Sequence, residues 1–229
     1  MTSLRNALAT SVAFLVLATP AWAADPITVL PPLPEPPAEL VFYDWTGPYV
    51  GVQVGYGFAT LGQTAGPDLL LDGAPIDLNG PFIGAYAGYN LQLDALAVGI
   101  EGDINASWIN ADFLWGANDI PGAASVDWFG SVRGRLGLAL DRTLLFATAG
   151  IAAAEANIDL PSVPANSYAL HGGWTAGLGI EHAFDDNWLG RVEYRYYGLG
   201  SETYFDPVFG ERDFDLSMHT VSVGLALKF

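Results

Sequence analysis

The sequence predicts an all-β protein, an eight-stranded antiparallel transmembrane β-barrel. Three observations lead to this fold class. From Pro48 onward, apolar residues recur at every second position in stretches of about 12 to 15 residues, the period of a strand whose two faces meet different surroundings. The connections between these stretches are alternately long and short. Beyond the N-terminus no apolar run is long enough for a membrane helix, although 51% of the residues are hydrophobic.

The composition supports many short strands and narrows the possible partners. Of 229 residues, 27 are glycine, 13% are aromatic and only 14% are charged. The chain has no cysteine, which excludes disulfides and thiolate metal sites. The net charge is -17 with only eight lysines and arginines, which argues against a nucleic-acid partner because phosphate binding needs clustered basic residues. Neither a metal site nor a cofactor site is predicted.

The N-terminal segment predicts export. Arg5, the apolar stretch from Ala7 to Ala18 and the small residues of Ala21-Trp22-Ala23 have the order of a cleavable signal peptide over residues 1–23. Residues 24–47 are rich in proline, which favours an extended spacer over a helix or a central strand. We expect this spacer to lie in the periplasm. A docking peptide for a proline-reading partner is the alternative.

The barrel domain is predicted over residues 48–229. The alternating stretches are 48–60, 80–92, 96–108, 126–140, 143–157, 172–184, 188–200 and 218–229. Long connections at 61–79, 109–125, 158–171 and 201–217 alternate with short ones at 93–95, 141–142 and 185–187. Outer-membrane barrels have tight periplasmic turns and longer outer loops, and about 9 to 11 residues per strand suffice to cross the membrane. Prolines beyond residue 47 fall at predicted strand starts or in the long connections.

The last stretch shows which face meets lipid. Val221, Val223, Leu225, Leu227 and Phe229 share one face, and smaller or polar residues share the other. A soluble β-sandwich would show the same alternation, so only the residues on the opposite face can distinguish a membrane barrel from a sandwich. The same parity places charged residues on the inward face of four stretches: Glu101, Asp103, Arg133, Arg135, Glu181, Arg191, Glu193 and Arg195. Four acids and four arginines at similar depth predict a charged layer in the lumen.

Aromatic residues mark the predicted lipid face and the lumen. Trp128, Trp174 and Trp188 stand outward at predicted strand ends, which is typical of membrane-interface girdles. Inward-facing rings are predicted to fill space beside the charged layer: Tyr49, Phe82, Tyr86 and Phe129. The stretch from Thr143 to Asn157 contains too much alanine for its two faces to be told apart.

Several segments resemble a known family. The segments are Asp44-Trp45-Thr46-Gly47-Pro48-Tyr49-Val50-Gly51, Val126-Asp127-Trp128-Phe129-Gly130-Ser131-Val132-Arg133-Gly134-Arg135-Leu136-Gly137 and Arg191-Val192-Glu193-Tyr194-Arg195-Tyr196-Tyr197. They resemble the porin-like, opacity-type outer-membrane β-barrel family of alphaproteobacteria over roughly residues 44–229. The resemblance implies a Gram-negative surface protein that is often immunogenic and supports envelope integrity. It also implies that Phe229, with Leu225 and Leu227, is the signal read by the barrel-assembly machinery.

Two functions compete for such a barrel. An interior of eight strands is just wide enough to be filled by side chains, so a salt-bridged layer would close it and leave a structural envelope protein that contacts lipid and lipopolysaccharide. Alternatively, the same charges could line a narrow pore for small polar solutes, as charged rings do in channels.

Two further possibilities rest on single residue types. A barrel enzyme could use His171 or His219 with Asp206, Asp213 and Asp215, although three histidines in one sequence are a weak signal. Acids in the long connections could bridge divalent cations to lipopolysaccharide, but solvation is the preferred interpretation because the acids lack a fixed metal-ligand spacing: Asp68, Asp72, Asp77, Glu202, Asp206, Glu211, Asp213 and Asp215. The sequence therefore favours a non-enzymatic outer-membrane barrel whose long loops could make extracellular contacts.

Overall fold

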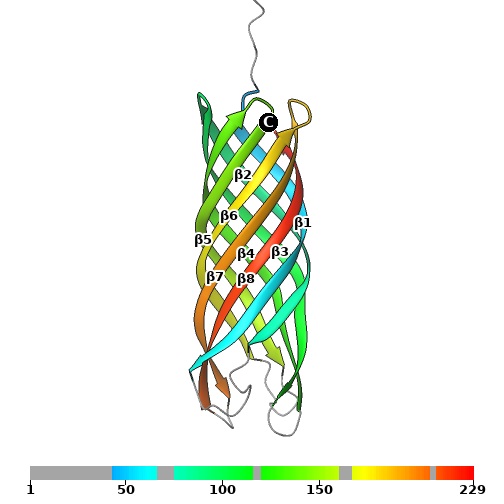
Figure 1. The fold of residues 1–229 in the computed structure, drawn as a ribbon, viewed down its shortest axis with the longest axis vertical. Helices are drawn as coiled ribbons and strands as arrows, with labels where there is room; N and C mark the ends of the chain where they lie inside the picture. Colours follow the sequence, from blue (N-terminus) through cyan, green and yellow to red (C-terminus); the bar gives the residue numbers. More distant parts are fainter. Residues whose placement is uncertain (1–42, 66–74, 116–119, 160–166, 207–209) are drawn as a thin grey trace, which may run out of the picture. The chain divides into compact units, whose positions relative to one another are not determined.

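The computed structural model describes residues 43–65, 75–115, 120–159, 167–206 and 210–229. Within these residues each strand pairs antiparallel with the next, and the last pairs with the first to close a barrel (Figure 1). The strands are β1 (Gly47–Ala65), β2 (Ile76–Leu93), β3 (Leu96–Trp115), β4 (Ile120–Leu140), β5 (Thr143–Asp159), β6 (Ser167–Ala183), β7 (Trp188–Asp206) and β8 (Gly210–Lys228). The predicted fold class is confirmed. The predicted signal peptide lies outside the described residues, as does the spacer up to residue 42.

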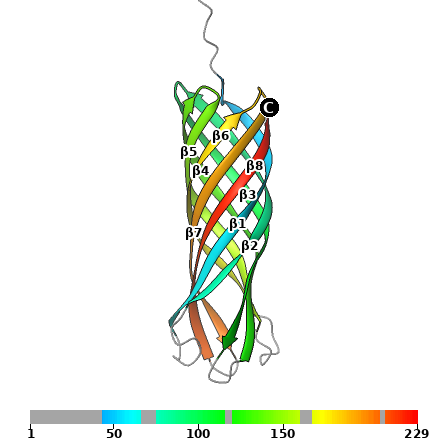
Figure 2. The same cartoon turned by 45° about the vertical axis from the view of Figure 1, so that its right-hand side comes forward.

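The two ends of the barrel differ. Short turns at residues 94–95, 141–142 and 184–187 gather at one end, together with the C-terminus, and this end is called the turn end (Figure 1). Asp94 and Asp141 begin two of these turns with a φ of 54°, a left-handed conformation that aspartate tolerates better than most residues. The opposite end, where the strands lead into the long connections, is called the loop end. Figure 2 shows β7, β8, β1 and β2 side by side across the seam that joins the first and last strands.

The strands are longer than the alternation predicted. They contain 17 to 21 residues, and the extra length lies at the loop end, so most residues assigned to the long connections are strand. The predicted extents of those connections were wrong. Pro81, expected at a strand start, lies inside β2 and is paired with Tyr56 of β1. On the other side of β2, the pairing with β3 is interrupted between Asn79 and Phe82, so the missing N–H of Pro81 breaks no ladder bond there.

Glycines in β1 and β2 leave room for rings from neighbouring strands. A Cβ on Gly51 would lie 2.5 Å from the ring of Tyr86, and one on Gly88 would lie 2.5 Å from the ring of Tyr49. Both glycines therefore allow a large inward side chain to lie over the neighbouring backbone. β1 and β2 have similar glycine-rich sequences, Gly47-Pro48-Tyr49-Val50-Gly51 and Gly80-Pro81-Phe82-Ile83-Gly84. This similarity reflects the packing that the two strands share.

Burial alternates along every strand. Inward Tyr49, Phe82, Tyr86 and Phe129 are all buried. Outward side chains along the turn-end part of the strands are mostly exposed and apolar, including Val52, Ile100, Leu136, Leu178 and Val223, with Thr143 and His182 as polar exceptions. In β5, whose parity the sequence left open, Leu144, Phe146 and Thr148 point inward. Among the described residues, no helix is found that is long and apolar enough to cross a membrane.

Candidate functional site

The candidate site is the interior of the barrel, which is filled at three successive levels. Nearest the turn end lies a turn-end cluster of Tyr43, Trp45, Tyr49, Tyr86, Ala97, Leu144, Phe146, Ala183, Leu189 and Ala226. Next comes an ionic layer, formed by Glu101, Asp103, Arg133, Arg135, Glu181, Arg191, Glu193 and Arg195. Beyond it lies a loop-end core built around Leu61, Leu78, Phe82, Ile109, Phe129, Tyr197, Leu216 and Met218.

The structure brings all eight predicted lumen charges together. Every one of these side chains is almost fully shielded from solvent, and each takes part in at least one ion pair. The acids come from β3, β6 and β7, and the arginines from β4 and β7. Strand period places them inward, because residues two apart share a face. Four positive and four negative side chains make the layer neutral overall.

Two carboxylates hold the layer together. Glu101 pairs with Arg133, with Arg191 at 2.6 Å and with Arg135 at 3.7 Å. Glu193 pairs with Arg133 at 2.7 Å, with Arg195 at 3.0 Å and with Arg191 at 3.5 Å. Each carboxylate is thus shared by three guanidinium groups. Loss of either one would leave several buried cations short of a partner.

The other two acids complete the charge balance. Asp103 pairs with Arg195 at 3.0 Å and with Arg133 at 3.4 Å. Glu181 pairs with Arg135 on the turn-end side of the layer. All four arginines therefore have a carboxylate partner, which is the condition under which buried charge is tolerated.

Neutral side chains also belong to the layer, among them Gln53 and Thr148, which were not singled out from the sequence. The Tyr49 hydroxyl donates to Glu101 at 2.7 Å and accepts from Arg135 at 3.1 Å. The Gln53 amide oxygen accepts from Arg191 at 3.1 Å and from Arg195 at 3.3 Å. Thr148 donates to Glu193 at 3.3 Å. Strand parity could have found Gln53, whereas Thr148 lies on the alanine-rich strand whose faces could not be told apart.

Aromatic rings cover the guanidinium groups on the turn-end side. The guanidinium carbon of Arg191 lies 3.5 Å from the ring centroid of Tyr86, and that of Arg135 lies 4.0 Å from the centroid of Phe146. Such cation–π contacts stabilise a desolvated cation by up to about 2 kcal/mol. The Nε atoms of all four arginines are buried and donate no hydrogen bond, so the layer still carries an energetic cost.

The turn-end cluster contains the residues just before β1. Trp45 is fully buried, its Nε1 donates to the Asp141 carbonyl at 3.0 Å, and its backbone N donates to Gln92 Oε1 at 2.8 Å. The Tyr43 hydroxyl donates to the Asp186 carbonyl at 3.3 Å. Because burial and nearby acids stabilise its neutral form, the pKa of Tyr43 is raised to about 12. Residues 43–46, which the sequence assigned to the spacer, thus contact two of the short turns, at residues 141–142 and 184–187, and Gln92 near the end of β2.

The loop-end core is apolar, with aromatic rings at its base next to the ionic layer. The rings of Phe82 and Phe129 lie 5.1 Å apart edge to face, and those of Phe129 and Tyr197 lie 5.5 Å apart in the same manner. Tyr197 connects this core to the ionic layer, because its hydroxyl accepts a hydrogen bond from Arg195 at 2.7 Å. Side chains therefore follow one another along the lumen from Trp45 to Leu61.

The remaining predicted residues lie on the outside. Trp174 and Trp188 are exposed, and Trp128 is half-buried with its Nε1 donating to Glu155 at 3.2 Å. Trp188 begins β7, but Trp128 and Trp174 lie well inside the longer strands β4 and β6, not at strand ends. At the C-terminus, Leu225 is exposed, Leu227 is partly exposed, and the side chain of Phe229 is 74% exposed.

The structure separates the residues of the hypothetical enzyme site. His171 is buried on the inward face of β6, whereas His219 is exposed on the outward face of β8, where its Nδ1 is 2.7 Å from the Tyr194 hydroxyl. Asp215 is exposed on β8, and the side chains of Asp206 and Asp213 lie outside the described part of the chain. Among the side chains that the structure describes, no three His, Cys, Asp or Glu residues are grouped as a metal site would require.

Comparison with known proteins identifies the family. The family model described as "Outer membrane protein beta-barrel domain" matches residues 9–229. The chain belongs to this outer-membrane β-barrel family. Its predicted location in the outer membrane is thereby confirmed. The predicted resemblance to the alphaproteobacterial barrels is confirmed by relatives from Brucella.

Two relatives are similar over nearly their whole length. The 25 kDa outer-membrane immunogenic protein of Brucella abortus is 33% identical over 235 residues, which is 100% of both chains. The 31 kDa outer-membrane immunogenic protein of Brucella melitensis is 32% identical, over 93% of this chain and 95% of the relative. Both are named as outer-membrane proteins and not as enzymes. Among solved structures, Neisserial surface protein A aligns with a TM-score of 0.46 at 16% identity, covering 79% of this chain and 97% of that one.

Proposed function

We propose that this protein is a structural component of the outer membrane whose lumen is closed and whose loop end is exposed at the cell surface. The observation that carries the proposal is the continuous filling of the interior by the turn-end cluster, the ionic layer and the loop-end core. A barrel filled in this way supports the membrane mechanically and does not conduct. The immunogenic relatives are in keeping with a surface-exposed role.

The energetics of the ionic layer support closure. A path for solutes would have to pass Glu101 and Glu193, each of which is held by three arginines. Removing one member of a buried ion pair costs about 3 to 5 kcal/mol, and opening this layer would disrupt several pairs at once. Thermal fluctuation would therefore open the layer very rarely.

The porin alternative makes the opposite prediction in planar bilayers. Purified protein should give no discrete conductance steps if the barrel is closed, whereas a narrow pore should give reproducible steps whose size grows with salt concentration. A variant in which four charged side chains of the layer are shortened while the layer stays neutral overall, Arg133→Ala and Arg191→Ala together with Glu101→Ala and Glu193→Ala, provides the positive control once its folded state is verified. Regular steps from the unmodified protein would refute the closed-lumen proposal.

The envelope role needs a cellular test. Deletion of the gene should increase sensitivity to detergents and to bulky antibiotics, and the unmodified chain should restore resistance. The charge-conserving variant Glu101→Asp tests whether the ionic layer itself is needed for this resistance. A deletion strain with unchanged sensitivity would refute the envelope role without bearing on conductance.

The proposal also assigns the orientation of the barrel in the membrane and the partners that it contacts. The turn end would face the periplasm, since such barrels have short periplasmic turns, and the Pro-rich residues 24–47 would lie on that side. Outer-membrane lipid and lipopolysaccharide would surround the exposed apolar face, with Trp128, Trp174 and Trp188 near its boundaries. The barrel-assembly machinery would bind the chain during biogenesis through Leu225, Leu227 and Phe229.

A further inference from the structure

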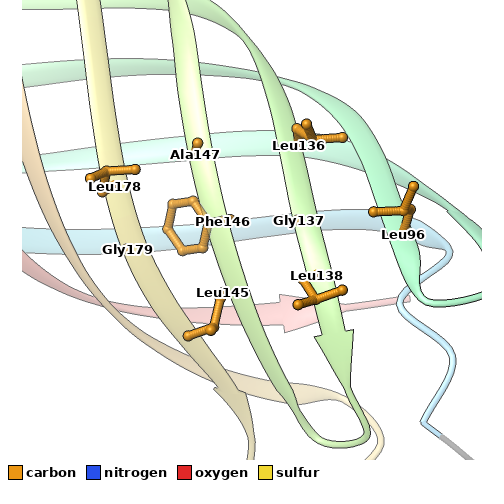
Figure 3. A pocket seen from close by; sticks show the side chains of 9 residues that line it. All are labelled: Leu96, Leu136, Gly137, Leu138, Leu145, Phe146, Ala147, Leu178 and Gly179. Carbon is orange, nitrogen blue, oxygen red and sulfur yellow. The ribbon is translucent and has the colours of Figure 1, made fainter.

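The outer surface of the barrel has a hollow near the turn end. A groove of about 420 Å³, here called the outer groove, lies over β3 to β6 and falls within the range of about 300 to 1,000 Å³ that is usual for small-molecule sites. Figure 3 shows its lining, in which Leu136, Leu138, Leu145 and Leu178 stand around Ala147 and two glycines. The lining is therefore apolar, as contact with an acyl chain requires.

The outer groove results from small side chains between larger ones. Ala147 of β5 pairs with Leu136 of β4 on one side and with Leu178 of β6 on the other. The two leucines are 55% and 65% exposed, so they protrude on either side of the alanine. In the next row away from the turn end, the paired outward residues are all small: Gly134, Ala149 and Ala176. The low surface therefore continues along β5 toward the middle of the barrel wall.

Two polar side chains lie between the outer groove and the turn end. Thr143 of β5 pairs with His182 of β6, and the Thr143 Oγ1 is 3.0 Å from the His182 Nδ1. Thr143 is four residues before Ala147 on the same face of β5, a distance of about 13 Å at 3.3 Å per residue. When Nδ1 accepts a hydrogen bond from Thr143, Nε2 carries the ring proton and can donate to an anionic oxygen. A hydrogen-bond donor thus lies at the end of the groove.

An exposed ion pair lies next to these polar side chains. Arg142, the residue before Thr143, pairs with Asp186 at 3.2 Å. Of the arginine side chains that the structure describes, only that of Arg142 lies outside the ionic layer. The short turns also carry exposed acids: Asp94, Asp141 and Asp185. A purely anionic ligand would be repelled by these acids, whereas a ligand that carries both a phosphate and an ammonium group complements both members of the ion pair.

We infer that this side of the barrel binds one zwitterionic phospholipid, with an acyl chain in the outer groove and the headgroup beside Arg142, His182 and Asp186. The guanidinium and imidazole N–H groups donate to the phosphate oxygens, and the Asp186 carboxylate accepts from the ammonium group. The acyl chain begins at the level of Thr143 and reaches Ala147 farther along β5. The choice of a phospholipid over lipopolysaccharide rests on the orientation proposed above, in which the turn end lies in the inner leaflet. The inference does not depend on a closed lumen.

Filling the outer groove tests the acyl-chain contact. Ala147→Leu places a larger side chain between Leu136 and Leu178, whereas Ala85→Leu makes the same change at an exposed position of β2. Both positions face outward, so both variants should fold, and the heat-induced shift in gel mobility would verify this. Native mass spectrometry in detergent would measure binding of the first phosphatidylethanolamine molecule. The apparent affinity should fall several-fold in Ala147→Leu and stay unchanged in Ala85→Leu. Equal affinities, or a protein dimer that only Ala147→Leu dissociates, would overturn the lipid site.

The headgroup contacts are tested by comparing two lipids. The unmodified protein should bind phosphatidylethanolamine several-fold more tightly than the anionic phosphatidylglycerol. Asp186→Asn should abolish this preference, whereas Asp94→Asn, which removes an exposed acid from another turn, should keep it. Arg142→Gln should weaken binding of both lipids because both carry a phosphate. Equal affinity of the unmodified protein for the two lipids would overturn the zwitterionic headgroup, and a preference that survives Asp186→Asn would overturn the contact with this carboxylate.

The orientation has a separate test that does not involve lipid binding. Ala95 is exposed in the turn between β2 and β3, and the chain has no cysteine, so Ala95→Cys introduces a single thiol at the turn end. A membrane-impermeant maleimide should label this thiol only after the outer membrane of the cells is permeabilised. Labelling of intact cells would refute the orientation and with it the choice of a phospholipid, whereas unchanged lipid binding in purified Ala147→Leu would refute the outer groove itself.

Discussion

Glu101 of β3 and Arg191 of β7 meet at 2.6 Å across the lumen, although their strands lie on opposite sides of the barrel. Three strands separate them in either direction around the closed sheet. Glu101 also pairs with Arg133 of β4 and accepts a hydrogen bond from Tyr49 of β1. One carboxylate therefore braces four strands and fixes the cross-section of the barrel, which backbone hydrogen bonds between neighbours cannot do alone.

The contacts of Glu101 predict that neutralising its carboxylate greatly lowers the stability of the barrel. Glu101→Gln keeps the size of the side chain and removes the charge that faces Arg133, Arg135 and Arg191. We expect a loss of about 3 to 5 kcal/mol in the free energy of unfolding, measured by urea unfolding in lipid vesicles.

An exposed ion pair provides the control. Arg142 and Asp186 pair at 3.2 Å at the turn end, where their side chains are 43% and 86% exposed. Asp186→Asn should therefore cost less than about 1 kcal/mol. Equal losses for Asp186→Asn and Glu101→Gln would contradict a special role for the buried layer.

Inward glycine should be required where a ring crosses the backbone. Gly51→Ala would place a Cβ 2.5 Å from the Tyr86 ring and 2.6 Å from the Leu225 carbonyl oxygen, so we expect a loss of about 1 to 3 kcal/mol from overpacking. Gly62→Ala on the same strand has open space at the corresponding position. Thermal unfolding, followed by the shift in gel mobility of the heated protein, would compare the two. A similar midpoint for both variants would show that Tyr86 moves aside easily.

Trp45 should anchor the segment before β1 without sealing the lumen alone. Trp45→Ala removes a fully buried ring and should destabilise the protein by about 3 to 5 kcal/mol, whereas Trp45→Phe should lose only the hydrogen bond to Asp141. Limited proteolysis should cleave next to residue 43 faster in Trp45→Ala than in Trp45→Phe. Both variants should remain silent in planar bilayers because the ionic layer is intact. Channel activity in Trp45→Ala would mean that the turn-end cluster is the main barrier.

Asp185 should make the β6–β7 turn sensitive to acid. Its carboxylate accepts from the backbone N of Trp188 at 2.7 Å and from that of Asn187 at 2.8 Å, and these bonds lower its pKa below 3.8. A lowered pKa in the folded state adds stability that is present above the unfolded pKa and is lost as pH falls through the folded pKa. The difference in unfolding midpoint between the unmodified chain and Asp185→Ala should thus be constant near neutral pH and shrink below about pH 4. A constant difference at all pH values would exclude this carboxylate as the cause.

Phe229 should matter for assembly more than for stability. Its side chain is largely exposed, and its backbone N donates to the Pro48 carbonyl at 3.0 Å, which any residue could do. Phe229→Ala should therefore lower the amount of folded barrel in the outer membrane several-fold while leaving the refolded protein as stable as before. An equal loss of refolding stability would point to packing instead of recognition.

The sequence predicted the strands well where the outward side chains are apolar and the inward side chains are polar, which is the arrangement that a membrane barrel requires. It failed toward the loop end, where the buried side chains are apolar and outward acids such as Asp77 and Asp215 suggested loops. It also failed for Tyr43 and Trp45, because the prolines before them suggested a spacer while burial of these rings depends on two turns distant in sequence. On β5, exposed Ala147 and buried Ala154 are the same residue type, so no pattern could separate the faces.

The docking of Trp45 carries information about the order of folding. Its partner Asp141 is 96 residues away, and Asp44 beside it accepts a hydrogen bond from Lys228, which is 184 residues away. These groups come together only after the last strand has joined the first, and contacts that close such long loops form late. Trp45 should therefore become buried in the final step of barrel closure, and its fluorescence, isolated by replacing the other tryptophans, would time that step.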